Sequence, residues 1–295
     1  MDQIYFMKHF IFTIYFSVLL CYTPAMYSAS NSEAINNRQL ISGYLGATHF
    51  ENVLYEYVTM LYTYQENTLS TFIQNDSLFA TESSKLFYKH FNISSLYMNI
   101  LDKLELLEKE VIEGFQLLSE YLNTNTGKRM LYYETLASQP SELAKLPIYM
   151  KSLKEIPPSK SRIRLVHRLD KAIEGSRISA RMTMDFLENI LIAINNALPE
   201  KEQTHTNAID ELIQTHYKKN LPEFQLAMQS AYLFTYRVVS DSELEKYVEQ
   251  YEYRSTKLAS LSLASTLIEV FQEAGFSFAH DLTKALDKHR VKMTR

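Results

Sequence analysis

The sequence predicts an all-α protein, a multi-helix bundle. Apolar residues recur at three- and four-residue steps along most of the chain, and strand-like alternation persists nowhere. The 295 residues include only six Gly and seven Pro, too few turn-forming residues for the many short connections of a sandwich or barrel. With 46% hydrophobic residues, the chain can bury a sizeable core.

The first element is a leader. An apolar block over residues 10–22 carries no charged side chain and follows Lys8, which is the layout of a signal peptide. The block is shorter than the ~20 apolar residues of a membrane-spanning helix, so a retained anchor is the weaker alternative. We expect a signal peptide over residues 1–25, cleaved after Ala25 or alternatively near Ala29, and no permanent membrane span after cleavage.

The chain's one cysteine, Cys21, lies in this leader. Lipidation there would require a small residue before the cysteine, and Leu20 occupies that position. The mature chain would then contain no cysteine, which excludes disulfides, thiolate nucleophiles and cysteine-bound metal centres. The expected location is the periplasm or the medium outside the cell.

Two amphipathic stretches follow. Apolar residues at helical spacing predict a helix over residues 50–72, and the run 96–122 repeats the pattern with acidic residues around the rest of its surface. The pattern is interrupted from Asn123 to Gly127 and resumes at Met130. We expect Gly127 to mark where a helix ends or bends.

The clearest boundary in the chain is the stretch 156–161. It contains Pro157 and Pro158, and each proline removes a backbone donor and restricts the residue before it. We expect a linker here, between an N-terminal helical half over residues 34–155 and a C-terminal helical half over residues 162–290.

The C-terminal half begins with a long apolar pattern. Residues 163–194 predict one helix, or two joined near Gly175, ending before Pro199. A further helix is expected over about residues 208–236, with Pro222 as a kink or a break.

The last helical stretch opens with a capping signal. Ser240 and Glu243 match the S-x-x-E capping box, in which the hydroxyl and the carboxylate each satisfy a free backbone N–H. The apolar pattern behind it continues to Phe271, and Gly275 is expected to cap the helix at its C-terminus.

Residues 234–247 carry a resemblance to a known family. They contain FTYR followed by S-D-x-E-L-x-x-Y, which resembles the exported bacterial helical proteins of domain-of-unknown-function family 2059. In that family the helix runs into a Ser-Pro-x-Gly step, whereas this chain has Tyr253 to Thr256 there. The opening of such proteins is similar to residues 169–199.

Residues 121–128 are similar to the same step, with Thr124 at the Ser position and Gly127 kept. The resemblance covers residues 101–139 and 162–271. It implies an exported helical fold and two diverged copies of one helical unit, so that the two halves are related. The family supplies no reaction.

One motif suggests an enzyme. Residues 167–171 read H-R-L-D-K, close to the H-R-L-D signature of a pseudouridine synthase, whose Asp attacks during base isomerisation. In that enzyme the signature is followed by Thr-Ser-Gly and a strand, but a helical pattern follows here. We expect instead that Leu169 packs in the core, while Arg168, Asp170 and Lys171 lie on a solvated face.

Other catalytic patterns are weak. Glu245 and Glu249 share a helix face at a spacing typical of surface charge. Seven histidines follow the leader, none at the spacing of an H-E-x-x-H zinc site. We therefore assign no catalytic, cofactor-binding or metal-binding residue. These histidines are His49, His90, His167, His205, His216, His280 and His289.

Two basic stretches can contact anionic lipid or polymer. The first covers residues 151–171, and the second is the tail. A ligand groove lined by some of the 21 Tyr is a further hypothesis. The cations are Lys151, Lys154, Lys160, Arg162, Arg164, Arg168 and Lys171 in the first stretch, and Lys284, Lys288, Arg290, Lys292 and Arg295 in the tail.

The expected function is an exported interaction or ligand-binding module rather than an enzyme. Its expected partner is a cell-envelope protein or polymer. A net charge of −4 argues against a nucleic-acid partner, which a basic surface would attract. The alternative is a periplasmic enzyme acting on envelope polymer through dispersed Glu, His and Tyr residues, and the RNA enzyme is the more remote one.

Overall fold

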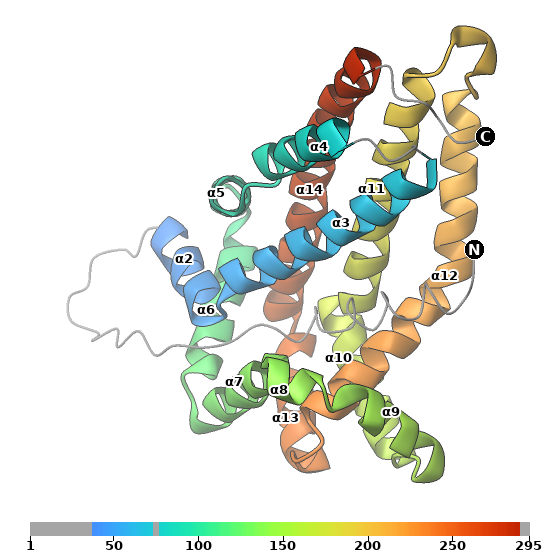
Figure 1. The fold of residues 1–295 in the computed structure, drawn as a ribbon. Coiled ribbons are helices and arrows are strands. Elements are labelled where there is room, and N and C mark those ends of the chain that lie inside the picture. The colour runs from blue at the N-terminus through green and yellow to red at the C-terminus, as the bar shows by residue number, and fades with distance from the viewer. Residues whose placement is uncertain (1–36, 73–76, 290–295) are drawn as a thin grey trace.

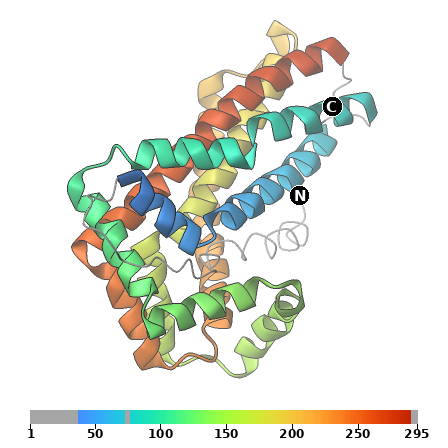
Figure 2. The ribbon, with the colours of Figure 1, turned by 90° about the vertical axis from the view of Figure 1, so that its left-hand side faces the viewer.

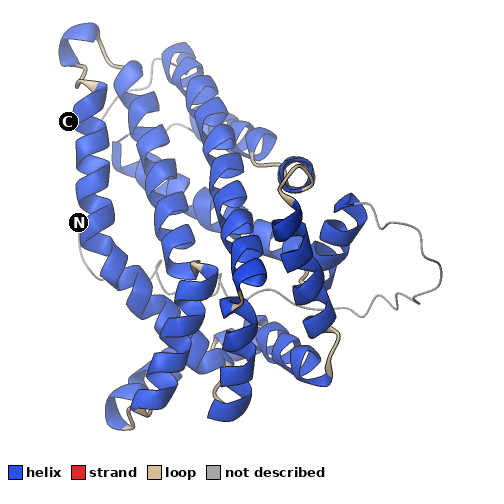
Figure 3. Cartoon of the chain, turned by 180° about the vertical axis from the view of Figure 1, so that it is seen from behind, coloured by secondary structure: helices blue, strands red, loops and turns tan. Residues whose placement is uncertain are grey.

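The computed structural model describes residues 37–72 and 77–289, and its regular structure is helical throughout (Figure 1; Figure 3). The predicted all-α, multi-helix fold is confirmed. The leader, residues 1–25 with the alternative cleavage near 29, lies outside the described residues, as do the last tail cations. Among the helices that are described, none is both long and apolar enough to cross a membrane.

Before the proline pair, the chain forms short and medium helices. They are α2 (Asn37–Ala47), α3 (Phe50–Phe72), α4 (Ser77–His90), α5 (Ile93–Leu104), α6 (Lys109–Leu122), α7 (Asn125–Ser138), α8 (Pro140–Leu143) and α9 (Leu146–Glu155).

The helices after the proline pair include the two longest of the described part of the chain, with 30 and 36 residues. In chain order, the elements after the pair are α10 (Lys160–Ile173), α11 (Gly175–Asn196), the 3-10 turn η2 (Glu200–Glu202), α12 (Thr206–Thr235), α13 (Asp241–Glu252) and α14 (Arg254–His289). The helix break at the prolines covers residues 156–159, because the Ser159 side chain accepts a hydrogen bond from the Arg162 N–H and starts α10.

The predicted capping box is confirmed. The Ser240 hydroxyl accepts a hydrogen bond from the Glu243 N–H at 3.3 Å and donates one to the Glu243 carboxylate at 3.0 Å. Thr124 caps α7 in the same way, through the Gly127 N–H at 3.1 Å. Gly127 therefore lies inside the first turn of α7, and the expectation that it ends a helix is wrong.

The stretch 96–122 is not one helix. It divides into α5 and α6 at residues 105–108, and α5 is seen end-on in Figure 1 while α6 runs down the picture. The bend lets α5 pack on α3 and α14, while α6 packs on α2 and a different part of α14. Leu106 in the bend is 83% exposed, so the apolar pattern is broken there although the sequence period continues.

Gly275 does not cap a helix, because α14 continues through it to His289. A Cβ atom at Gly275 would lie 2.5 Å from Asn189 Nδ2 of α11. The residue is glycine because two helices approach closely at that point. Of the two forms predicted for residues 163–194, the pair is correct: α10 and α11 meet at Glu174, which has a φ of 56°.

One hydrophobic cluster contains residues from both sides of the prolines. Helix α14 lies at its centre and packs against α4, α5 and α6 as well as α10, α11 and α13. Figure 2 shows α14, in orange to red, running beside α4. Aromatic rings of α4, α11 and α14 meet in this core, with Phe87, Phe186 and Phe278 at centroid distances of 5.8 to 5.9 Å. The predicted halves therefore share a core.

Helix α14 also approaches α6 too closely for a side chain. A Cβ atom at Gly114 would lie 2.1 Å from the Ser255 backbone oxygen and 2.9 Å from Ala259 Cβ. Backbone cannot move away as a flexible side chain can, so we expect Gly114→Ala to lower the free energy of unfolding by about 1–3 kcal/mol. Chemical denaturation followed by circular dichroism measures the change.

Gly43→Ala is the control, because we expect it to change the free energy of unfolding in the opposite direction. Gly43 lies on the exposed side of α2 with no heavy atom within 4 Å of a built Cβ. Gly43→Ala is expected to raise the free energy of unfolding by about 0.5–1 kcal/mol through helix propensity. A Gly114→Ala variant as stable as Gly43→Ala would contradict the close packing of α6 on α14.

Candidate functional site

The H-R-L-D motif lies in α10, not at a strand. Leu169 is 1% exposed, as expected. The expectation that Arg168 and Asp170 are merely solvated is wrong, because both have partners. Arg168 Nη2 lies 2.6 Å from Glu252 Oε2, and Asp170 accepts hydrogen bonds from the Ser176 N–H at 2.9 Å and the Ser176 hydroxyl at 2.6 Å.

Asp170 therefore holds the junction of α10 and α11. Burial raises the pKa of its carboxyl above the ordinary value, and the bonds from Ser176 oppose that rise. A carboxylate placed in this way satisfies an N–H in the first turn of α11. Its observed contacts explain a local structural role without any substrate.

The outward side of α10 is a basic stripe. Its exposed residues are spaced by four, three and four, so they form one line along the helix. Within the described residues, no carboxylate forms an ion pair with the three permanent cations of the stripe. The basic stripe consists of Lys160, Arg164, His167 and Lys171.

The other arginines of the helix are used internally. Arg162 Nε lies 2.8 Å from Asp241 Oδ1, and its Nη2 donates to the Val239 carbonyl oxygen. Arg168 joins α10 to α13 through Glu252 and, at 3.4 Å, Glu245. The predicted basic stretch thus separates into arginines that hold α13 and cations that face solvent.

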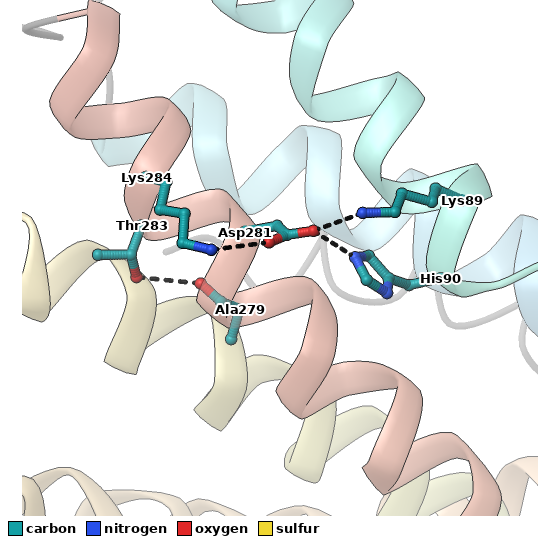
Figure 4. A network of polar contacts seen from close by, with 6 residues as sticks. All are labelled: Lys89, His90, Ala279, Asp281, Thr283 and Lys284. Atoms are coloured by element: carbon teal, nitrogen blue, oxygen red, sulfur yellow. Dashed lines mark hydrogen bonds and ion pairs between the residues drawn. The ribbon is translucent and has the colours of Figure 1, made fainter.

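The tail cations that are described form ion pairs, Lys288 with α4 and Lys284 within α14. Figure 4 shows Asp281 of α14 with Lys89 and His90 of α4 on one side and Lys284 on the other. Lys89 Nζ and His90 Nε2 lie 2.8 and 2.9 Å from Asp281 Oδ2. Hydrogen bonds from Lys89 and His90 hold the pKa of the Asp281 carboxyl below its ordinary value.

A second set of contacts joins the same two helices with the acid and the Lys-His pair exchanged between them. Glu82 of α4 accepts from Lys288 Nζ at 2.8 Å, and His289 Nε2 lies 2.6 Å from the same carboxylate. Each helix thus supplies one acid and, seven and eight residues later, a Lys-His pair. We call these two sets the reciprocal clamp. The cations of the C-terminal stretch up to His289 are therefore bound within the molecule.

The dispersed Glu and Tyr residues of the enzyme hypothesis meet in one buried place. Glu134 of α7 is 2% exposed and accepts hydrogen bonds from the hydroxyls of Tyr236 and, at 2.7 Å, Tyr247. The Tyr251 hydroxyl lies 3.3 Å from that of Tyr247. Burial and Glu134 raise the pKa of Tyr121 to about 12.

This cluster joins α7 to residues beyond the prolines. Tyr236 and Tyr247 are the tyrosines of the FTYR and E-L-x-x-Y motifs, so the motif residues have a structural use. No chemical signal distinguishes Glu134 in the sequence beyond its position on the inward side of α7, between the buried Leu131 and Ala137.

The seven histidines do not assemble. His90 and His289 belong to the reciprocal clamp, and His167 lies on the basic stripe. Among residues 37–72 and 77–289, no group of three or more His, Cys, Asp or Glu side chains can hold a metal ion.

Glu56 is the carboxyl with the clearest chemical signal. It is partly buried on α3, and burial raises its pKa to about 8. A carboxyl that titrates near neutrality is a candidate general acid or base. The sequence did not single it out, because its burial depends on how other helices cover α3.

We expect Glu56→Gln to raise the free energy of unfolding at pH 8 by about 1–3 kcal/mol, because partial exposure of the side chain keeps the gain below that for a fully buried charge. The raised pKa means that the folded state holds a proton that the unfolded state loses above about pH 4.5. Ionisation therefore destabilises the wild type increasingly as pH rises from about 4.5 to 8, and glutamine cannot ionise. Urea unfolding at pH 5 and pH 8 measures the difference.

Glu51→Gln makes the same chemical change at an exposed position of α3 and should not give the same rise in the free energy of unfolding at pH 8. An equal effect of Glu56→Gln at both pH values would mean that burial does not govern this carboxyl.

Comparison with protein-family models, curated proteins and solved structures gives no match for the chain. The resemblance to domain-of-unknown-function family 2059 therefore stays a prediction.

Proposed function

We propose that this chain is an exported, all-helical protein that acts by binding, and that the basic stripe of α10 contacts an anionic partner in the cell envelope. The observation that carries the proposal is that all exposed residues of α10 are basic and its three permanent cations have no acidic partner among the described residues. Unpaired cations in a line give a local positive potential on a chain of net charge −4.

The contrast within the helix supports this proposal. Arg162 and Arg168 are committed to contacts with α13 and the segment before it, and they fix the orientation of α10. Lys160, Arg164 and Lys171 are then held outward on a rigid element. A surface built in this way favours the association rate and the selection of oppositely charged partners.

Family membership and two related halves are part of the same proposal. In the family step, Thr124 and Tyr253 occupy the same Ser position. Each directly precedes a helix, α7 from Asn125 and α14 from Arg254. This shared position at a helix start supports the internal similarity.

Charge reversal tests the binding surface. Lys160→Glu/Arg164→Glu/Lys171→Glu is expected to lower the affinity for isolated cell envelopes roughly 100-fold at low salt, because each cation contributes about 1 kcal/mol near an anionic surface. Co-sedimentation with the envelopes measures this affinity. Lys201→Glu/Lys218→Glu/Lys219→Glu is the control, since these exposed lysines carry the same charge on another part of the molecule. If both variants lose the same affinity for the envelopes, the loss comes from the net charge and the basic stripe is not the binding surface.

Export is tested separately. Mass spectrometry of the protein recovered from the envelope fraction is expected to find an N-terminus near Met26, or near residue 30 for the second cleavage site. Recovery from the cytosol with an intact N-terminus would overturn export.

The second candidate function is the periplasmic enzyme, and Glu56 is the observation that favours it. A pKa of about 8 suits a proton donor or acceptor near neutrality. Turnover of an envelope-polymer substrate that is abolished by Glu56→Gln, and preserved by Glu51→Gln, would favour this function over binding alone.

A further inference from the structure

The corner between α9 and α10 exposes apolar as well as basic side chains. Ile148 is 73% exposed and Ile156 is 77% exposed. Lys151 and Lys154 are exposed on the same short segment, and Lys160 begins the next helix. We call these five residues the α9–α10 corner.

The inward side of α9 is already occupied. Leu146 is buried, while Tyr149 and Leu153 pack against the core, and the Tyr149 hydroxyl donates to the Leu233 carbonyl oxygen at 3.0 Å. Ile148 lies on the opposite side, one turn from Lys151. The exposure of Ile148 is therefore a consequence of how α9 is fixed, and not of a loosely packed helix.

Single exposed apolar residues are ordinary on protein surfaces, but here cations lie between and after the two isoleucines. From Ile148 to Lys160 the segment contains three lysines and only one acid, Glu155. Its connection contains Pro157 and Pro158, which have no N–H group that would lose a hydrogen bond where water is excluded. Figure 1 places α9 at the end of the bundle opposite the α11–α12 connection, so the corner is at an extremity.

We propose that the α9–α10 corner docks on the surface of an anionic phospholipid bilayer, with Ile148 and Ile156 entering the boundary between headgroups and acyl chains. This rests on the proposed function, because Lys160 and the rest of the basic stripe contact the same anionic surface. Cations bind lipid phosphates there, and long Lys side chains keep the charge in water while their stems cover apolar surface. A soluble polyanion or an acidic polymer satisfies the cations but offers no place for the isoleucines.

Vesicle sedimentation tests the proposal. The protein as purified from the cell is mixed with vesicles of phosphatidylcholine alone, or of phosphatidylcholine and phosphatidylglycerol in equal amounts. We expect binding to the anionic vesicles only. Ile148→Ser/Ile156→Ser should weaken that binding about 10-fold or more, because apolar burial is lost. The same variant should bind beads coated with dextran sulfate as the wild type does.

Leu106→Ser/Leu212→Ser is the matched control. Leu106 and Leu212 are 83% and 48% exposed and lie away from the corner in the sequence. This control should bind anionic vesicles as the wild type does. Helical circular dichroism and the thermal midpoint confirm that each variant is folded, and all variants carry the same N-terminus, so the leader cannot produce a difference.

The outcomes separate the two proposals. If Ile148→Ser/Ile156→Ser binds anionic vesicles as well as the wild type, the bilayer inference is overturned while cation-driven binding survives. If the charge-reversed basic stripe also binds vesicles and dextran sulfate normally, the proposed function fails too. Equal binding to neutral and anionic vesicles would likewise overturn the inference.

Discussion

The close approach of α14 to two other helices is the constraint on which the rest of the fold depends. At Gly114 of α6, a backbone oxygen of α14 occupies the space in which a Cβ atom would lie. At Gly275 of α14, the side chain of Asn189 from α11 occupies that space. Helix α6 comes before the prolines and α11 comes after them. Because one continuous helix must fit against both, residues on either side of the prolines pack into one core.

Polar contacts then set the register of the surrounding helices. Exposed ion pairs contribute only about 0–1 kcal/mol each, so the reciprocal clamp orients α4 on α14 more than it stabilises the fold. Glu134 is different, since a buried carboxylate without partners is costly. The hydroxyls of Tyr236 and Tyr247 satisfy it only when α7 and α13 are correctly placed. Both sets of contacts form only when segments that are far apart in the sequence take one relative position.

Local signals allowed part of this to be predicted. The Ser240 capping box and the amphipathic helix over residues 50–72 depend on neighbours in the chain, and both are present. Gly275 was misinterpreted because a glycine for close packing and a glycine for a cap look alike until the neighbouring helix is known. For the site, the spacing from Lys160 to Lys171 was visible in the sequence, but the commitment of Arg162 to Asp241 requires the tertiary fold.

The basic stripe follows from the same packing logic. Helix α10 buries Leu165, Val166 and Leu169 and uses Arg162 and Arg168 against α13, so the side that carries the basic stripe faces water. Lys160 and Arg164 lie one turn apart, where like charges repel by a few tenths of a kcal/mol, so an acid at either position would serve stability better. Their equal sign therefore costs stability and brings no ion pair within the described residues. A function in binding an anionic surface gives that cost a physical reason.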